Sequence, residues 1–175
     1  SKEGRTYAAG ITALMGGAAY ETSAEIAKAV GSFRGYTLNE EPMLEVIKKQ
    51  SDNIEKILDE SSIGTYLSQT SYYDEIKKLI DASREVWNNA YEKGKKFGIR
   101  NAQTTVLAPT GTIGFMMDCD ATGIEPNIAL LAYKTLSGGG VEEIVAQSVE
   151  PGLKSLGYPE EEIRDLPSTH LLRHT

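Results

Sequence analysis

The sequence predicts an α/β protein in which a helical segment leads into an α/β unit. Two observations carry this prediction. Apolar residues recur at helical spacing over residues 1–98, with glycine, proline and capping residues between the runs. From Ile99 onward, short β-branched runs alternate with glycine-rich turns. We therefore expect a mainly helical region over 1–98, a strand, loop, strand and helix over 99–163, and an unassigned tail over 164–175.

Two helices are predicted before Gly31. Apolar positions at helical spacing indicate the first helix, and Gly16 and Gly17 are expected to end it. Thr22–Glu25 then has the form of a capping box, in which a hydroxyl and a carboxylate satisfy backbone N–H groups at a helix start. The second helix would begin there and end near Gly31.

Two longer helices are expected next, joined by polar residues 60–70. The first begins at Asn39–Pro42, which supplies a candidate cap, acidic residues and a proline for the first turn. The second runs from about Tyr73 to Lys93 and is ended by Gly94 and Gly98. Their predicted apolar faces are Met43, Ile47, Ile54, Ile57 and Leu58 in one helix and Ile76, Leu79, Ile80, Ser83, Trp87, Ala90 and Tyr91 in the other.

Short strands are predicted on both sides of a long loop rich in glycine and threonine. Thr104–Leu107 is β-branched and apolar and precedes Pro109, so it is interpreted as a buried strand. Ile128–Tyr133 is the second candidate strand, and Gly138–Gly140 ends it. A helix is predicted over 142–147, followed by two short helices that Pro151, Gly152, Gly157 and Pro159 delimit.

Composition and charge exclude several classes of protein. A formal net charge of -7 argues against a nucleic-acid-binding protein but not against a nucleotide substrate, which needs only a local anion site. One cysteine excludes an intrachain disulfide and fits a reducing, cytoplasmic compartment. No apolar run reaches the ~18–20 residues of a membrane span, so we expect no membrane association. Because the sequence starts at Ser1, within a helical pattern, we expect a fragment of a longer chain.

The residues Pro109–Ile113, which follow the predicted strand, suit an anion-binding loop. Glycine lets the backbone approach a ligand, and two threonine hydroxyls with consecutive N–H groups can point at one oxyanion. If a helix begins near Thr112, its dipole adds to the attraction. The loop lacks the GxxxxGK[ST] pattern of a Walker A motif. A simple turn with a capped helix behind it is an equally good interpretation from the residues alone.

Several other side chains have both a chemical and a structural interpretation, and the structural one is favoured each time. Cys119 is expected to be a small, buried structural thiol. Asp118 and Asp120 could bind a divalent cation, but aspartates more often cap turns. His170 and His174 lie four residues apart without a third ligand nearby, so we predict no metal site. A solvated face or helix packing is expected for the basic residues Lys93, Lys95, Lys96 and Arg100 and for Tyr72, Tyr73 and Trp87.

The string RNAQTTVLAPTGTIGFMMDCDATGIEP, residues 100–126, closely resembles the catalytic subunit of ribonucleotide reductase, in particular its adenosylcobalamin-dependent (class II) branch. The resemblance extends upstream through GRTYAAGITALMGGAAYETSAEIAKAVGSF and NEEPMLEVI, and downstream through ALLAYKTLSGGG to about LGYPEEEI. The sequence departs from the family after about Ile163. It also departs at Ala121 and Asn127, where the family often has threonine and aspartate.

The resemblance implies a ten-stranded α/β barrel, of which this chain would hold only a part. It implies that Pro109, Thr110, Gly111, Thr112 and Ile113 hold the phosphates of a ribonucleoside di- or triphosphate substrate. The implied reaction gives a 2′-deoxyribonucleotide: the Co–C bond of adenosylcobalamin breaks homolytically, a cysteine thiyl radical abstracts the 3′-hydrogen, and two further cysteines supply electrons. Deoxynucleotide and ATP effectors, a thioredoxin-type reductant and a possible homodimer are implied as well.

The resemblance also sets a limit on what this chain does alone. The family's radical cysteine lies in an Asn-x-Cys-x-Glu motif, which is absent here, and one cysteine cannot supply both a thiyl radical and a reducing pair. Glu125 is implied either to face the active site or to have a structural role. We therefore expect an inactive segment of an active enzyme. Two rival hypotheses are a non-enzymatic helical interaction module with a structural Gly-Thr loop, and a phosphoryl-transfer enzyme, which would need a lysine and a metal-binding carboxylate that the loop lacks.

Overall fold

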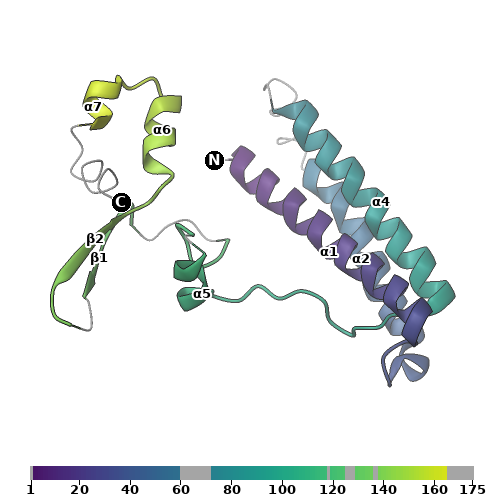
Figure 1. Ribbon diagram of the computed structural model, residues 1–175. Coiled ribbons are helices and arrows are strands. Elements are labelled where there is room, and N and C mark those ends of the chain that lie inside the picture. The colour runs from purple at the N-terminus through teal and green to yellow at the C-terminus, as the bar shows by residue number, and fades with distance from the viewer. Residues whose placement is uncertain (1, 60–71, 118, 125–128, 136–137, 165–175) are drawn as a thin grey trace. The chain divides into compact units, whose positions relative to one another are not determined.

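The computed structural model describes residues 2–59, 72–117, 119–124, 129–135 and 138–164 (Figure 1). The chain divides into two compact units, Ser1–Val106 and Leu107–Thr175. Within the described residues, no helix is both long and apolar enough to cross a lipid bilayer.

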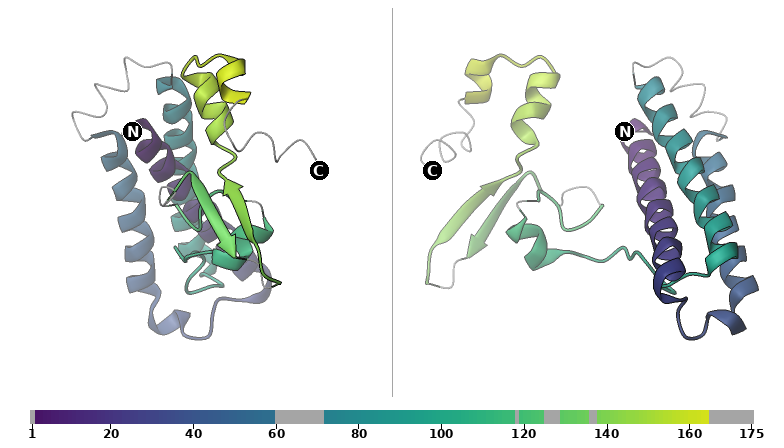
Figure 2. Two further views of the ribbon diagram at one scale, coloured as in Figure 1. Left: turned by 90° about the vertical axis from the view of Figure 1, so that its left-hand side faces the viewer. Right: turned by 45° about the vertical axis from the view of Figure 1, so that its right-hand side comes forward.

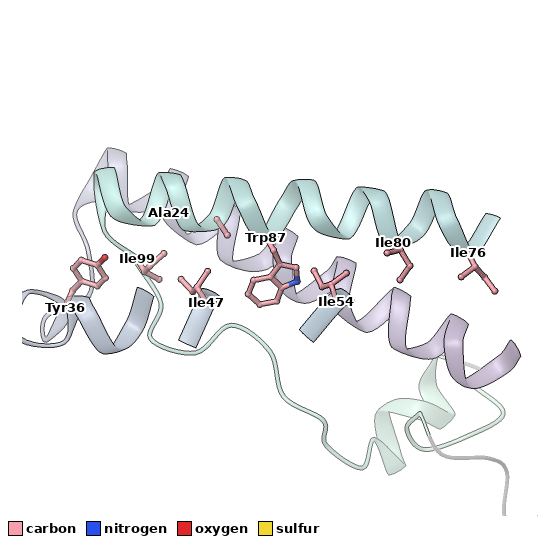
Figure 3. Close-up of a cluster of buried hydrophobic side chains, with 9 residues drawn as sticks. Ala24, Tyr36, Ile47, Ile54, Ile76, Ile80, Trp87 and Ile99 are labelled. Carbon is pink, nitrogen blue, oxygen red and sulfur yellow. The ribbon is translucent and has the colours of Figure 1, made fainter. Parts of the chain in front are cut away.

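Three long helices form the first unit. They are α1 (Lys2–Val30), α2 (Glu40–Asp59) and α4 (Tyr73–Phe97), and the short 3-10 helix η1 (Tyr36–Leu38) precedes α2. The long helices lie side by side, and α4 packs against both of the others (Figures 1 and 2). The core of this unit runs along α4 (Figure 3) and consists of Ala24, Tyr36, Ile47, Ile54, Ile76, Ile80, Trp87, Ala90 and Ile99.

The apolar faces predicted for the two later helices are confirmed. In α2, Ile47 and Ile54 are buried, and Met43 and Ile57 are half-buried. Five of the seven residues predicted for the face of α4 are buried, and Leu79 and Tyr91 are half-buried. α2 begins at Glu40, directly after the predicted cap Asn39. The side chain of Leu58 and the predicted connection over 60–70 lie outside the described residues.

The prediction of two helices before Gly31 is wrong, because α1 is continuous from Lys2 to Val30. Gly16 and Gly17 lie where α4 crosses α1. A Cβ atom added to Gly17 would lie 2.5 Å from Cγ2 of Val86 and 2.8 Å from Cδ1 of Trp87. The close packing that glycine permits outweighs its poor helix propensity. The predicted capping box therefore lies inside a helix.

The prediction that Gly94 ends the fourth helix is also wrong, since α4 continues to Phe97. Gly94 is buried, and a Cβ atom there would lie 2.9 Å from Cδ1 of Ile99. Its carbonyl accepts a hydrogen bond from the Tyr36 hydroxyl at 3.0 Å. The helix ends at Gly98, whose φ of 78° favours glycine.

The second unit contains short elements. These are α5 (Gly111–Met116), β1 (Leu131–Thr135), β2 (Val141–Val145), α6 (Val149–Ser155) and α7 (Glu160–Arg164). The strands form an antiparallel hairpin in which Leu131 pairs with Val145 and Thr135 with Val141. The two short helices predicted near the end of this region correspond to α6 and α7, although Pro151 and Gly152, which are predicted to delimit them, lie inside α6.

The helix predicted over 142–147 is wrong, since most of that segment is β2. Gly139 and Gly140 have φ values of 79° and 116°, which lets the chain reverse between the strands. The Val-Glu-Glu-Ile-Val segment is rich in β-branched residues, so it pairs readily with β1. The strand predicted before it is confirmed in part, because β1 begins at Leu131 and continues to Thr135.

The strand predicted at Thr104–Leu107 is not formed. Residues 103–110 have no regular secondary structure, and Val106 and Leu107 are 83% and 71% exposed. A buried strand needs neighbouring strands to bind its backbone N–H and C=O groups. No described part of the chain pairs with this segment.

Candidate functional site

The loop predicted to bind an anion is closed by Thr110. Its backbone N–H donates to the Thr122 carbonyl at 2.5 Å, and its hydroxyl Oγ1 donates to the same oxygen at 2.8 Å. The Thr110 carbonyl in turn accepts from the N–H of Gly114 at 2.7 Å. These bonds join the two ends of the segment 110–122, which holds α5 and the turn after it.

The residues around Thr110 are open to solvent. Pro109, Gly111, Thr112 and Ile113 are exposed, and a Cβ atom on Gly111 would meet nothing within 4 Å. α5 begins at Gly111, so a helix does start next to Thr112, although it is only six residues long. The first N–H groups of a helix have no partner within it. The loop thus presents backbone donors and a threonine hydroxyl at an uncovered surface.

Asp120 links this loop to the start of α6. Its Oδ1 accepts from the N–H of Gln147 at 2.7 Å, and its Oδ2 accepts from the N–H of Ser148 at 2.9 Å. Hydrogen bonding by the Ser148 side chain and by these two N–H groups lowers the pKa of Asp120. The carboxylate therefore caps backbone groups, as predicted, but those of a segment 27 residues further along the chain.

The cysteine, the remaining carboxylates and the histidines singled out in the sequence differ in where the structure places them. The thiol of Cys119 is exposed, so the expectation of a buried structural thiol is wrong. The backbone N–H of Cys119 donates to the Gly114 carbonyl at 2.9 Å, which stabilises the turn after α5. Asp118, Glu125, His170 and His174 lie outside the described residues. Within the described part of the chain, no group of three or more His, Cys, Asp and Glu side chains could hold a metal ion.

The basic residues before the loop bind groups of α1 and its C-terminal end. Lys93 forms ion pairs with Glu21 and Glu25, each at 2.7 Å. The hydrogen bonds that Lys93 donates to these carboxylates raise its pKa. Arg100 Nη1 donates to the carbonyls of Gly31 and Ser32 at 3.4 and 3.3 Å. These contacts hold the end of α4 against α1, which favours a structural role for the cluster.

Trp87 has the packing role that the sequence predicts. Its ring is buried, and Nε1 donates to the Ala13 carbonyl at 2.8 Å. Tyr72 meets Tyr7 edge to face, with ring centroids 6.3 Å apart, and the Tyr7 hydroxyl donates to Glu75 at 2.7 Å. The Tyr7–Tyr72 pair joins α1 to the start of α4, and Trp87 joins it to the middle of that helix.

One contact that the sequence does not reveal precedes the loop. The Ser23 hydroxyl is buried in α1, donates to Oδ1 of Asn101 at 3.0 Å and accepts from the Asn101 N–H at 2.8 Å. The Ser23 carbonyl accepts from the N–H of Arg100 at 3.2 Å. The chain therefore leaves the helical unit from a fixed point. The partners are 78 residues apart, so no local pattern could have found them.

Comparison with known proteins identifies the family. The model of the ribonucleotide reductase barrel domain matches residues 1–171. The chain belongs to the ribonucleotide reductase family. It is 49% identical over 89% of its length to a protein of Rhodopirellula baltica named vitamin B12-dependent ribonucleotide reductase. Proteins of the same name from Bradyrhizobium diazoefficiens and Streptantibioticus cattleyicolor are 44% and 38% identical over 95% and 99% of the chain.

The chain spans a small part of these reductases. It corresponds to 14%, 13% and 27% of the proteins from Rhodopirellula, Bradyrhizobium and Streptantibioticus, respectively. The match to the barrel-domain model runs through both units, so the helices of the first unit and the loop of the second belong to one domain of this family. The family resemblance first drawn from residues 100–126 is thereby confirmed.

Proposed function

We propose that this chain is part of the catalytic barrel of a vitamin B12-dependent ribonucleotide reductase, whose full-length form reduces ribonucleoside di- or triphosphates to 2′-deoxyribonucleotides. The observation that carries the proposal is the match over residues 1–171 to the barrel-domain model, together with the Rhodopirellula and Bradyrhizobium relatives that bear that enzyme's name. A ten-stranded barrel would supply the neighbouring strands that Thr104–Leu107 lacks within the described residues.

Pro109–Ile113 are proposed to bind the substrate's phosphates. Phosphate oxygens accept hydrogen bonds, and the exposed residues Gly111, Thr112 and Ile113 offer backbone N–H groups and one hydroxyl as donors. The open space at Gly111 lets a phosphate approach the backbone. The chain's net charge of -7 makes such local donors necessary for binding an anion.

Adenosylcobalamin is the proposed cofactor of the full-length enzyme and would supply the radical that starts the reaction. We assign none of the described residues to it. The chain has one cysteine, so the thiyl radical and the reducing pair are proposed to come from cysteines elsewhere in the enzyme. A cytoplasmic location, deoxynucleotide and ATP effectors, a thioredoxin-type reductant and a homodimer complete the proposal.

The experiment is reduction of a ribonucleotide by the full-length protein, with and without adenosylcobalamin. The wild type is compared with Thr110→Ala/Thr112→Ala and with the control Thr135→Ala, at an exposed residue of β1 outside the loop. We expect cobalamin-dependent deoxynucleotide formation, and a KM raised about tenfold or more by the double change alone, since hydrogen bonds to charged groups are the stronger kind. Absence of product with the cofactor would refute the proposed activity, and an unchanged KM would refute the phosphate loop.

The rival hypothesis of a non-enzymatic helical interaction module is not favoured. The family match covers the helical unit and the loop together, and the helices themselves resemble the reductases over most of their length. An interaction module would require the helices to act without the loop.

A further inference from the structure

The two threonines of the loop have different surroundings, although the sequence presents them as equivalent. Both donors of Thr110, its N–H and its hydroxyl, point at the Thr122 carbonyl, at 2.5 and 2.8 Å. A hydroxyl has a single O–H to donate, and an ionised phosphate only accepts. While this closure holds, Thr110 therefore has no donor left for a phosphate.

Thr112 is exposed, and within the described part of the chain its hydroxyl makes no hydrogen bond. It lies two residues after Thr110, at the start of α5, beside the open space at Gly111. Its O–H can turn toward a ligand without breaking an existing bond. Of the two hydroxyls, this one is available as a donor to the substrate.

The closure made by Thr110 is part of a connected set of bonds. The Thr110 carbonyl accepts a hydrogen bond from the N–H of Gly114, and the Gly114 carbonyl accepts one from the N–H of Cys119 at 2.9 Å. Asp120, the next residue, is fixed to the N–H groups that precede α6. The Thr122 carbonyl that Thr110 binds thus belongs to a segment that is itself anchored. A bond to an anchored carbonyl can fix the position of the residues on either side of Thr110.

We infer that Thr110 is a positioning residue and that Thr112 supplies the hydroxyl that contacts the substrate phosphate. This inference rests on the proposed phosphate-binding function of the loop. Thr110 would act before substrate binds, by keeping Gly111–Ile113 in the conformation that presents their donors. Loss of its hydroxyl should loosen the free loop, whereas loss of the Thr112 hydroxyl should weaken only the contact with substrate.

The test compares Thr110→Val and Thr112→Val in the full-length protein, since valine keeps the shape of threonine and removes the hydroxyl. Thr135→Val is the matched control, because Thr135 is an exposed threonine of β1 that takes no part in the loop. Amide hydrogen exchange over residues 107–124 is measured without nucleotide. KM is then measured for a ribonucleoside diphosphate and triphosphate in the presence of adenosylcobalamin.

We expect Thr110→Val to speed exchange in the free loop and to raise KM about tenfold, and Thr110→Ser to restore both. Thr112→Val should raise KM by a similar factor with exchange unchanged, and Thr135→Val should change neither. If Thr110→Val yields no folded protein, Thr110→Ala, which adds no methyl group, makes the same comparison.

Two outcomes separate the inference from the function on which it rests. Exchange that is unchanged in Thr110→Val, or equally fast in Thr112→Val, would overturn the division of roles even where both variants raise KM. A KM unaffected by either variant would overturn the inference together with the phosphate loop, even where exchange responds as expected.

Discussion

Asp120 shows how a single carboxylate can connect the candidate loop to a distant part of its unit. Because its pKa is lowered in the folded protein, the ionised form is favoured there by the Ser148 side chain and the N–H groups of Gln147 and Ser148. The stabilisation is present above 3.8, the ordinary pKa of an aspartate, and is lost as the pH falls through the lower pKa of the folded state. The connection therefore holds at neutral pH and weakens only in acid.

We expect NMR titration of the carboxyl of Asp120 to give a midpoint below 3.8, accompanied by a shift of the Ser148 amide signal. Asp120→Asn should remove the acid-dependent shift of that signal, since an amide side chain does not titrate in this range. A midpoint at or above 3.8 would show that the two backbone hydrogen bonds are not formed in solution.

At the scale of single elements, the packing of α1 on α4 depends on glycine. Gly17→Ala would place a Cβ atom 2.5 Å from Cγ2 of Val86, and Trp87 beside it is held by its bond to the Ala13 carbonyl. Alanine gains about 1 kcal/mol in helix propensity, but overpacking costs about 1–3 kcal/mol. We expect a net loss of roughly 1 kcal/mol in the free energy of unfolding, measured by urea titration of the helical circular dichroism of the chain.

Gly152→Ala in α6 is the matched control for this prediction. An added Cβ atom there meets nothing within 4 Å, so the gain in helix propensity should appear without a packing cost. A Gly17→Ala variant at least as stable as the wild type would contradict the prediction. It would mean that Val86 leaves more room for a Cβ atom at Gly17 than the 2.5 Å separation in the structure.

The elements that the sequence predicts correctly are those with a local signal. α2 and α4 are amphipathic, so the spacing of their apolar residues gives both their extent and their buried faces. The extent of α1 could not be predicted in this way, because α1 is apolar on several sides. Its glycines are required by close packing against α4, which lies far away in the sequence. For β2, the sequence pattern predicts a helix after Gly138–Gly140, and pairing with β1 decided the outcome.

For the candidate loop too, the sequence predicts the features that depend on local residues and misses those that depend on distant ones. Its residue types and their order predict a backbone suited to an anion, and the family match covers it. The roles of its two threonines could not be predicted, because the Thr122 carbonyl that distinguishes them lies 12 residues along the chain. Likewise, nothing near Asp120 in the sequence indicates that it binds Gln147 and Ser148.

At the scale of the whole molecule, one face of α1 is uncovered. Ile11, Met15, Ile26 and Val30 follow one another at helical spacing, opposite the face that packs on α4, and are 49%, 61%, 43% and 64% exposed. A helix that is apolar on opposite faces is typical of the interior of a larger protein. The chain spans 13–14% of the length of two of its relatives, so in the full-length reductase proposed above other parts of the protein would cover this face.

We expect the 175-residue chain to bind the dye ANS through this face. Replacing all four residues by glutamine should lower the dye fluorescence and raise the solubility, with the helical circular dichroism unchanged, because none of the four lies in the buried core. The control replaces Lys77, Lys78, Glu85 and Glu92, exposed residues of α4, by glutamine, which also changes four residues and preserves the net charge. Dye binding that persists in the α1 variant would place the exposed apolar surface elsewhere, and the exposed Val106 and Leu107 would be the next residues to replace.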